Sequence, residues 1–307
     1  MDNGIHVIDT GFHRPRFDAA YLVVENGRGA FIDCGTSLSV PALLAGLAEA
    51  GLAPEAVDWL ILTHVHLDHA GGAGALIGHL PNARAVVHPR GAPHMIDPTR
   101  LIAGATAVYG EAEMARSYGR IEPIPAERVA LAHEGHVVSL AGRRLVCLDT
   151  PGHAQHHLCV WDAASRSIFS GDTFGISYRE LDSAAGAFVF PTTTPVQFDP
   201  AALKASVARL AALEPERVYL THFGAIEDIA RQAKALAEWI DAMVDGALRL
   251  ADAPDRHAAL VALLDALYVP RAAAHSGLAP EAVRELIGMD IELNAQGLGV
   301  WLDRRAR

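Results

Sequence analysis

The segment Thr63-His64-Val65-His66-Leu67-Asp68-His69 places three imidazoles and one carboxylate within six residues, directly after an apolar run. Neutral imidazole is the commonest metal ligand in proteins, and zinc accepts both nitrogen and oxygen ligands. Alternate residues of an extended segment point the same way, so His64 and His66 can converge on one ion. Asp68 and His69 come where the chain turns into a helix, and they can face a second ion. Four ligands are more than one catalytic zinc needs, so the segment predicts a site for two ions.

Polar side chains also follow three later apolar runs, each at the point where a predicted strand ends. Such strand ends are where binding groups gather in layered α/β folds. Gly152 and Gly171 come directly before two of these side chains, which suits tight turns. The further candidate ligands are His153 after residues 145–148, Asp172 after residues 167–169 and His222 after residues 218–220.

The elements that must position these residues are strands mixed with helices. Strands are predicted at 21–24, 30–33, 59–62, 84–88, 137–140, 143–148, 157–161, 167–169 and 217–220. The Asn26-Gly27 pair predicts a hairpin turn between the first two. Helices are predicted at 43–47, 70–80, 101–118, 203–213, 226–251, 255–268 and 279–293. Hairpins together with crossovers indicate sheets flanked by helices.

The composition excludes several classes of protein. The chain has 307 residues, of which 51% are apolar and 20% are charged, so it can bury a core and is not disordered. The net charge of −11 argues against nucleic acid and against membrane binding through a basic patch. Three cysteines without a CxxC motif argue against a disulfide scaffold. With no signal-like start and no long uninterrupted apolar run, we expect a cytoplasmic protein that acts on a small molecule, and a homodimer is left open.

The motifs resemble those of the metallo-β-lactamase fold superfamily of metal-dependent hydrolases. The resemblance covers residues 5–225 and rests on Asp33 in Ile32-Asp33-Cys34-Gly35, the His64–His69 motif, His153, Asp172 and His222. It implies an α/β fold, a four-layer αβ/βα sandwich with a helical C-terminal extension. The catalytic domain would span 1–225, with an insertion at about 90–128. The helical region 226–307 would pack on or beside the active-site face.

The resemblance also implies how the ligands are shared between two metals. His64, His66 and His153 would bind the first ion, Asp68, His69 and His222 the second, and Asp172 would bridge both. Zinc is the first expectation for both divalent ions, and iron or manganese are the alternatives. Asp33 is expected to orient a ligand through a hydrogen bond, and His157 to support the metal-binding loop. Candidates for substrate contact are Tyr178, Phe174 and His94.

The predicted chemistry is hydrolysis by a metal-bridging hydroxide that attacks a carbonyl ester, first of all a thioester, as in the glyoxalase II or thioesterase branch. Asp68 would act catalytically by taking or returning a proton. The alternatives are a lactonase, or a non-hydrolytic iron-dependent redox or binding member of the same superfamily. Asp172 stands where classical β-lactamases often have cysteine, which argues against antibiotic hydrolysis. No basic cluster follows residue 226, which argues against hydroxyacylglutathione itself.

Overall fold

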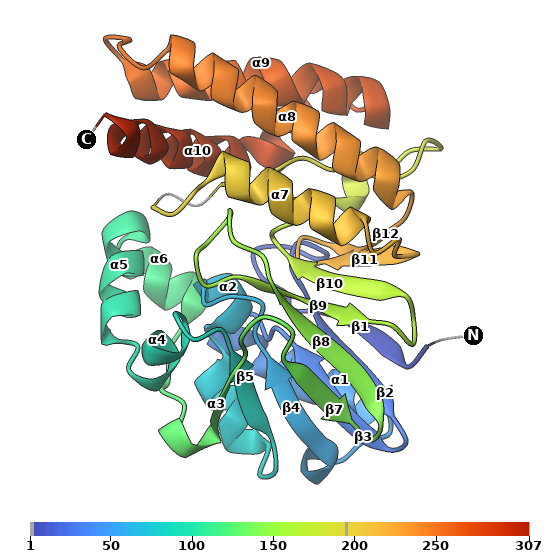
Figure 1. The fold of residues 1–307 in the computed structure, drawn as a ribbon. Coiled ribbons are helices and arrows are strands. Elements are labelled where there is room, and N and C mark those ends of the chain that lie inside the picture. The colour runs from blue at the N-terminus through green and yellow to red at the C-terminus, as the bar shows by residue number, and fades with distance from the viewer. Residues whose placement is uncertain (1–2, 194–195, 307) are drawn as a thin grey trace. The chain divides into compact units, whose positions relative to one another are not determined.

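The computed structural model describes residues 3–193 and 196–306. The chain folds into two compact units that alternate along the sequence. Unit 1 comprises Met1–Asp149, His156–Gly171 and Tyr219–Gly224, and unit 2 comprises Thr150–Gln155, Asp172–Val218 and Ala225–Arg307. The predicted fold class is confirmed, because the chain forms two six-stranded sheets with flanking helices and a helical C-terminal region (Figure 1). The division into domains at residue 225 stays a prediction.

The first sheet has the strand order β1-β2-β3-β4-β5-β6 and lies entirely in unit 1. The β2–β3 hairpin turns at Asn26-Gly27, where both residues have positive φ, as the dipeptide predicts. From β3 to β6 the strands run parallel, so helices must carry the chain back between them. The strands are β1 (Ile5–Asp9), β2 (Ala19–Glu25), β3 (Arg28–Ile32), β4 (Val57–Ile61), β5 (Arg84–Val87) and β6 (Val129–Leu131).

The helices between these strands bury their apolar faces against the sheet. They are α1 (Val40–Glu49), α2 (Leu67–Ala70) and α3 (Ala73–His79). Leu43 of α1 and Leu76 of α3 share one buried cluster with Leu22, Phe31 and Leu60 of the strands. Because β3 and β4 are parallel, with Ile32 paired to Ile61, their carboxyl ends lie at the same edge of the sheet. Asp33 and the motif that starts at Thr63 therefore leave the sheet side by side.

The second sheet has the order β12-β11-β10-β9-β8-β7, and β7 to β10 are antiparallel neighbours. Inside unit 1 its aromatic side chains meet those of the first sheet. The Phe169 ring lies 5.3 Å from the Tyr21 ring and 5.1 Å from the Tyr219 ring, centroid to centroid. The strands are β7 (Val137–Leu140), β8 (Arg143–Asp149), β9 (Leu158–Asp162), β10 (Ser167–Gly171), β11 (Arg217–Leu220) and β12 (Gly224–Ile226).

The predicted insertion is a run of short helices in unit 1: α4 (Ala92–Ile96), α5 (Thr99–Tyr109), α6 (Glu111–Glu113) and a π-helical turn at Met114–Tyr118. The expected helix between 101 and 118 is thus confirmed, with an interruption at Gly110. Three strands were not predicted: β1, β6 and β12. All three lie at sheet edges, and they bury few side chains: β6 and β12 have three residues each, and β1 buries two of its five.

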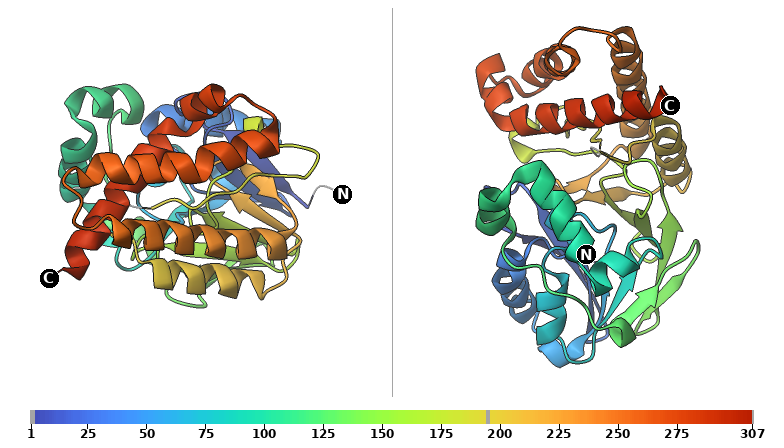
Figure 2. Two further views of the ribbon diagram at one scale, coloured as in Figure 1. Left: turned by 90° about the horizontal axis from the view of Figure 1, so that it is seen from above. Right: turned by 90° about the vertical axis from the view of Figure 1, so that its left-hand side faces the viewer.

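Unit 2 contains α7 (Pro200–Ala211), α8 (Ile229–Arg249), α9 (Arg256–Ser276) and α10 (Pro280–Arg305) (Figure 2). The three C-terminal helices are confirmed, and the last two are longer than predicted. The helix α9 continues past Pro270 and ends before Gly277, which has the positive φ typical of a helix stop. In the part of the chain that the structure describes, α9 alone is long and apolar enough to cross a membrane. This is weak support for a membrane span, since core helices of soluble proteins meet the same criterion.

Candidate metal centre

The motif after β4 has the backbone that the sequence predicts. His66 is the extended residue before α2, with φ −66° and ψ 152°, and Asp68 and His69 lie in the single turn of that helix. His64 and His66 therefore project from extended chain, whereas Asp68 and His69 project from a helix start. A carboxylate in the first turn of a helix is favoured by the helix dipole.

Asp68, His69 and His222 form a compact group within unit 1. One ligand atom from each lies within 4.8 Å of the others. The Oδ2 atom of Asp68 is 3.7 Å from Nε2 of His69 and 3.5 Å from Nε2 of His222. Two imidazole nitrogens and one carboxylate oxygen that face a common point are a donor set for zinc, iron or manganese. The residues present therefore fit a divalent cation.

Asp33 holds His69 in the tautomer that such a cation needs. The buried Asp33 carboxylate accepts hydrogen bonds from the Thr63 backbone N–H at 2.8 Å and from the Thr63 hydroxyl at 2.7 Å. Its Oδ2 atom also lies 2.9 Å from Nδ1 of His69 and 3.2 Å from the Thr221 hydroxyl. Because a carboxylate can only accept, Nδ1 carries the proton and Nε2 keeps its lone pair for a metal. This is the geometry that the predicted orienting role of Asp33 requires.

The loop between β1 and β2 holds the His222 side chain through a hydrogen bond and a ring contact. Its Nδ1 atom donates to the carbonyl oxygen of Phe17 at 3.2 Å, which leaves Nε2 facing Asp68. The Phe17 ring packs edge-on against the His222 ring with centroids 5.5 Å apart. One residue earlier, the Thr221 carbonyl accepts a hydrogen bond from the Ala19 backbone at 2.8 Å.

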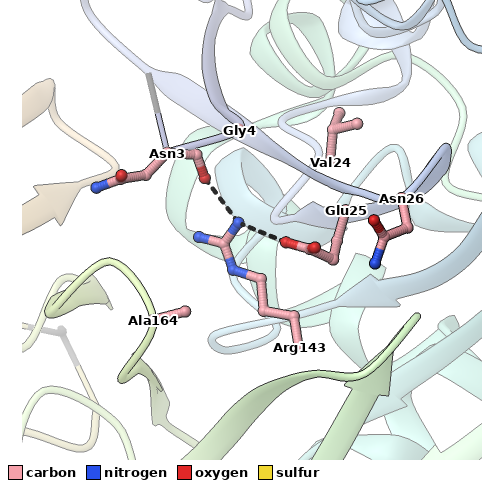
Figure 3. A pocket seen from close by; sticks show the side chains of 7 residues that line it. All are labelled: Asn3, Gly4, Val24, Glu25, Asn26, Arg143 and Ala164. Atoms are coloured by element: carbon pink, nitrogen blue, oxygen red, sulfur yellow. Dashed lines mark hydrogen bonds and ion pairs between the residues drawn. The ribbon is translucent and has the colours of Figure 1, made fainter. Parts of the chain in front are cut away.

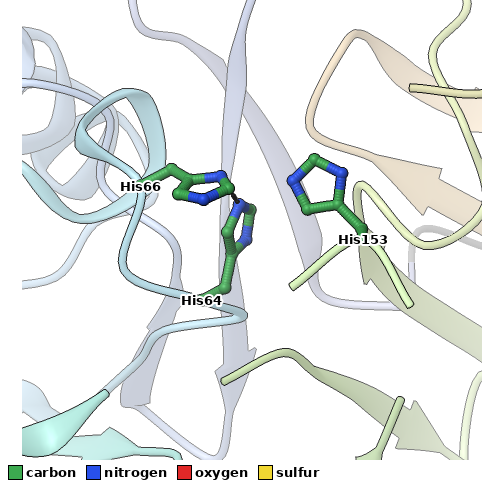
Figure 4. A group of neighbouring side chains, drawn as sticks. All are labelled: His64, His66 and His153. Carbon is green, nitrogen blue, oxygen red and sulfur yellow. Dashed lines mark hydrogen bonds between the residues drawn. The ribbon is translucent and has the colours of Figure 1, made fainter. Parts of the chain in front are cut away.

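His64 and His66 meet through their ring nitrogens. Nε2 of His64 lies 2.7 Å from Nδ1 of His66, and the two rings are nearly perpendicular (Figure 4). His157 is completely buried and stacks on the His64 ring with centroids 4.8 Å apart. His156 packs edge-on against His66 at 5.6 Å. His157 thus lies where a residue that supports the metal-binding loop must lie, and its role stays a prediction.

The end of β10 approaches this group so closely that only glycine fits there. Gly171 has a φ of +48°, and a Cβ atom on it would come within 2.7 Å of both Nε2 of His157 and the hydroxyl of Thr63. The close approach explains why a glycine precedes the predicted ligand Asp172.

The predicted ligands His153 and Asp172 both belong to unit 2, where their side chains lie close together. Nε2 of His153 lies 3.3 Å from Oδ2 of Asp172, and both side chains are buried. The loop of His153 is held by α7. The Asp199 N–H donates to the Gly152 carbonyl at 2.8 Å, and the Ser206 hydroxyl donates to the Pro151 carbonyl at 2.7 Å.

The three candidates for substrate contact are buried or half-buried side chains. Tyr178 is completely buried, and its hydroxyl donates to the Asp290 carboxylate of α10 at 3.0 Å. The Tyr178 hydroxyl thus has a partner inside unit 2, and the expected substrate contact of Tyr178 stays a prediction. Phe174 is also completely buried and offers no surface to a substrate. His94 is half-buried on α4 of the insertion.

Asp18 is a functional candidate that the sequence analysis missed. Its carboxyl group is fully buried beside the loop that holds His222, and the Thr10 hydroxyl lies 3.3 Å from its Oδ2 atom. Burial raises the pKa of Asp18 well above its ordinary value, although the charges of His222 and His69 oppose this shift. No local pattern signals such a residue, because its burial comes from distant segments.

A pocket of about 320 Å³ lies elsewhere in unit 1 and contains no motif residue (Figure 3). Arg143 dominates it, but its guanidinium is already satisfied. It donates to the Asn3 carbonyl at 2.6 Å, pairs with the buried Asp162 carboxylate and lies 3.6 Å from the Glu25 carboxylate. The pocket therefore marks a structural ion pair between hairpins. Its lining residues are Asn3, Gly4, Val24, Glu25, Asn26, Arg143 and Ala164.

Comparisons with known proteins agree with this fold. The Metallo-beta-lactamase fold-containing protein ST1585 of Sulfurisphaera tokodaii is 26% identical over 228 residues, which cover 73% of this chain and 79% of the relative. A structure of the archaeal protein ST1585 from Sulfolobus tokodaii is similar with a TM-score of 0.69 and 22% identity, over 97% of this chain and 99% of that one. The family protein TTHA1429 from Thermus thermophilus is similar with a TM-score of 0.64 and 25% identity, over 93% of this chain and 94% of that one.

Relatives with a named activity are also similar. The hydroxyacylglutathione hydrolase of Aeromonas hydrophila is 29% identical over 167 residues, which cover 54% of this chain. The matched region spans 48% of that relative, about half of its length. The family model described as the Metallo-beta-lactamase superfamily matches residues 7–222, the span that holds every predicted ligand. The chain therefore belongs to the metallo-beta-lactamase superfamily.

Proposed function

We propose that this chain is a dinuclear metal-dependent hydrolase that cleaves a thioester. The observation that carries the proposal is the group of Asp68, His69 and His222, whose ligand atoms face one another within 4.8 Å while Asp33 holds the tautomer of His69. A group built only for packing would not need three ionisable side chains with an oriented imidazole among them. Zinc is the proposed ion, and iron or manganese are the alternatives.

The proposed ligand set follows the order of the family motifs along the chain. Its members in unit 1 are His64, His66, Asp68, His69 and His222, and its members in unit 2 are His153 and Asp172. When bound, divalent cations supply an acidified water and positive charge beside a carbonyl oxygen. The side chain of Asp68 is 24% exposed, whereas that of His69 is fully buried, so we assign proton transfer to Asp68.

The choice of a thioester rests on the named relatives. Hydroxyacylglutathione is a thioester, and several hydrolases that carry its name are 29–30% identical to this chain. The match spans only about half to two thirds of those relatives, so we do not extend the proposal to the glutathione part of their substrate.

Metal analysis combined with a substrate panel tests the proposal. We expect about two metal ions per chain by mass spectrometry and turnover of acyl thioesters in preference to oxygen esters and lactones. His66→Ala and Asp172→Ala should each lose metal and turnover while the far-ultraviolet circular dichroism spectrum stays native. His79→Ala, an exposed imidazole on α3, is the matched control and should keep both. Metal-loaded protein that is inactive on every substrate would overturn the proposed activity in favour of a binding role.

A further inference from the structure

Three large apolar side chains on two segments of unit 1 are unusually exposed. Leu38 is 57% exposed, Val108 is 45% exposed and Tyr109 is 38% exposed. Leu38 belongs to the short helical turn after β3, and the other two end α5 of the insertion. Single exposed apolar residues are ordinary, but a contiguous set marks a place where an apolar partner binds.

Contacts with Tyr118 and Gly119 bring Leu38 and Tyr109 together, and Val108 precedes Tyr109 in α5. The Tyr109 and Tyr118 rings lie 5.5 Å apart, centroid to centroid. A Cβ atom built on Gly119 would lie 3.1 Å from a methyl group of Leu38, so Leu38 packs directly on the backbone after Tyr118. The hydroxyl of Ser37 also donates to the Tyr118 carbonyl at 2.8 Å. We call the exposed residues Leu38, Val108 and Tyr109, together with the buried Tyr118, the apolar patch.

Two sets of contacts connect the apolar patch with the metal-binding residues of unit 1. The first is a row of aromatic rings. Tyr118 packs on Phe12 at 5.5 Å, Phe12 packs on Phe17 at 5.8 Å, and Phe17 packs on His222 at 5.5 Å. These three aromatic side chains are buried, so the rings pack the interior between a proposed metal ligand and the patch.

The second set anchors the end of the insertion on α3 and on the turn after α2, the helix that carries Asp68 and His69. A Cβ atom on Gly71, directly after α2, would lie 3.5 Å from a methyl group of Ile121. Gly74 comes so close to the backbone of Glu122 that a Cβ atom there would lie 2.1 Å from its carbonyl oxygen. The charge of Asp68 also acts on Tyr118, where it adds to burial in raising the pKa of the phenol. The patch therefore begins beside the proposed site of hydrolysis.

We propose that the apolar patch binds the acyl chain of the substrate, so that the enzyme selects thioesters of apolar acyl groups longer than acetyl. This inference rests on the proposed function and specifies its substrate class. The occupant follows from position and chemistry. Leu38, Val108 and Tyr109 present exposed aliphatic and aromatic carbon, and the buried Tyr118 ring that contacts Tyr109 lies within reach of the charge of Asp68. Burial of each methylene of such a chain is favourable by about 0.8 kcal/mol, which is about fourfold in affinity.

A chain-length series measures the predicted selectivity. With straight-chain acyl thioesters of N-acetylcysteamine, from acetyl to decanoyl, kcat/KM should rise by about two- to fourfold for each methylene that contacts the patch, mainly through KM. Leu38→Asp and Val108→Asp should lower the ratio of octanoyl to acetyl kcat/KM by about tenfold or more. Leu248→Asp is the matched control, because Leu248 is 42% exposed on α8, and it should leave the ratio unchanged.

A binding measurement separates this inference from the proposed hydrolysis. The thioether S-octyl-N-acetylcysteamine lacks the thioester carbonyl that hydrolysis would attack. Calorimetry should detect its binding to metal-loaded wild-type protein and the loss of this binding in Leu38→Asp. If wild type binds the thioether, Leu38→Asp does not, and the protein hydrolyses no thioester, the acyl-binding role of the patch is supported and the proposed hydrolysis is wrong. Turnover without chain-length dependence and without thioether binding would overturn the patch alone. Conversion of a dimer to a monomer by Leu38→Asp, seen by light scattering, would also overturn it, because the patch would then be an interface between copies.

Discussion

The Oδ2 atom of Asp33 accepts a hydrogen bond from Nδ1 of His69 at 2.9 Å, and this contact joins the end of β3 to the helix after β4. The same carboxylate accepts from Thr63 and Thr221, so one side chain at the end of β3 holds three segments that carry or precede proposed ligands. Asp33 adopts a positive φ of 54° to do so, a backbone conformation that is uncommon for aspartate. Strain of this kind is retained where a site requires it.

Replacement of Asp33 should therefore weaken metal binding, although Asp33 is not itself a proposed ligand. Asp33→Ala removes the acceptor of His69 Nδ1, so we expect metal affinity to fall by about 10- to 100-fold, measured by competition with a chelator. Thr221→Val removes only the longest of the four hydrogen bonds and is the control, with a much smaller expected loss. Native affinity in Asp33→Ala would contradict the orienting role.

Gly171→Ala should disrupt the metal centre through a steric clash. The new methyl group would come within 2.7 Å of His157 and Thr63, and the residue would also be strained at φ +48°. Gly142→Ala has a positive φ of +98° but nothing within 4 Å, so it isolates the cost of strain. We expect both variants to lose about 1–2 kcal/mol of stability from strain, and only Gly171→Ala to lose bound metal as well. Equal metal content in the two variants would refute the proposed crowding.

The ion pair of Arg143 and Asp162 should contribute far more to stability than the pair of Arg28 and Asp58. The Asp162 side chain is fully buried and that of Arg143 is 4% exposed, whereas the side chains of Arg28 and Asp58 are 36% and 29% exposed. Removal of one partner leaves a buried charge in the first case, so Asp162→Asn should cost about 3–5 kcal/mol. Asp58→Asn should cost about 1 kcal/mol or less. Urea denaturation of both variants tests the contrast, which similar midpoints would contradict.

Asp18 should make the stability of the metal-free protein depend on pH. Because burial raises its pKa well above the ordinary value of 3.8, the folded state holds the proton more tightly than the unfolded state does. The stabilisation is fully present below 3.8 and is lost as the pH rises towards the folded pKa. Asp18→Asn removes this loss, so its stability relative to wild type should increase with pH in urea denaturation. Asp241→Asn on the exposed face of α8 is the control, and a difference that does not change with pH would contradict the prediction.

The three thiols should resist modification in the folded protein. Cys34, Cys147 and Cys159 are all buried, and burial raises the pKa of Cys147 to about 12 and that of Cys34 well above its ordinary value. Since the thiolate is the reactive form, we expect little reaction with a disulfide reagent in buffer and three equivalents in guanidinium. Rapid labelling of any one thiol in the native protein would show that its surroundings open readily.

The sequence alone was enough to predict the fold class, the superfamily and the proposed ligands, because that information is local. The ligands are encoded as short motifs at strand ends. The parallel neighbours β3 and β4 bring Asp33 and the His64–His69 motif to one edge of the first sheet. The C-terminal helices were equally predictable from their periodicity. The edge strands β1, β6 and β12 were not, since each has too few buried apolar residues to form a recognisable pattern.

The tertiary structure decided which side chains hold the proposed ligands and which candidates are unavailable. Phe17 supports His222 across 205 residues, and Asp33 reaches Thr221 across 188 residues. Asp290 accepts a hydrogen bond from the Tyr178 hydroxyl across 112 residues, a contact that the sequence did not predict for this candidate. Contacts at such separations depend on how packed layers bring distant segments together, and no local spacing of residue types specifies them.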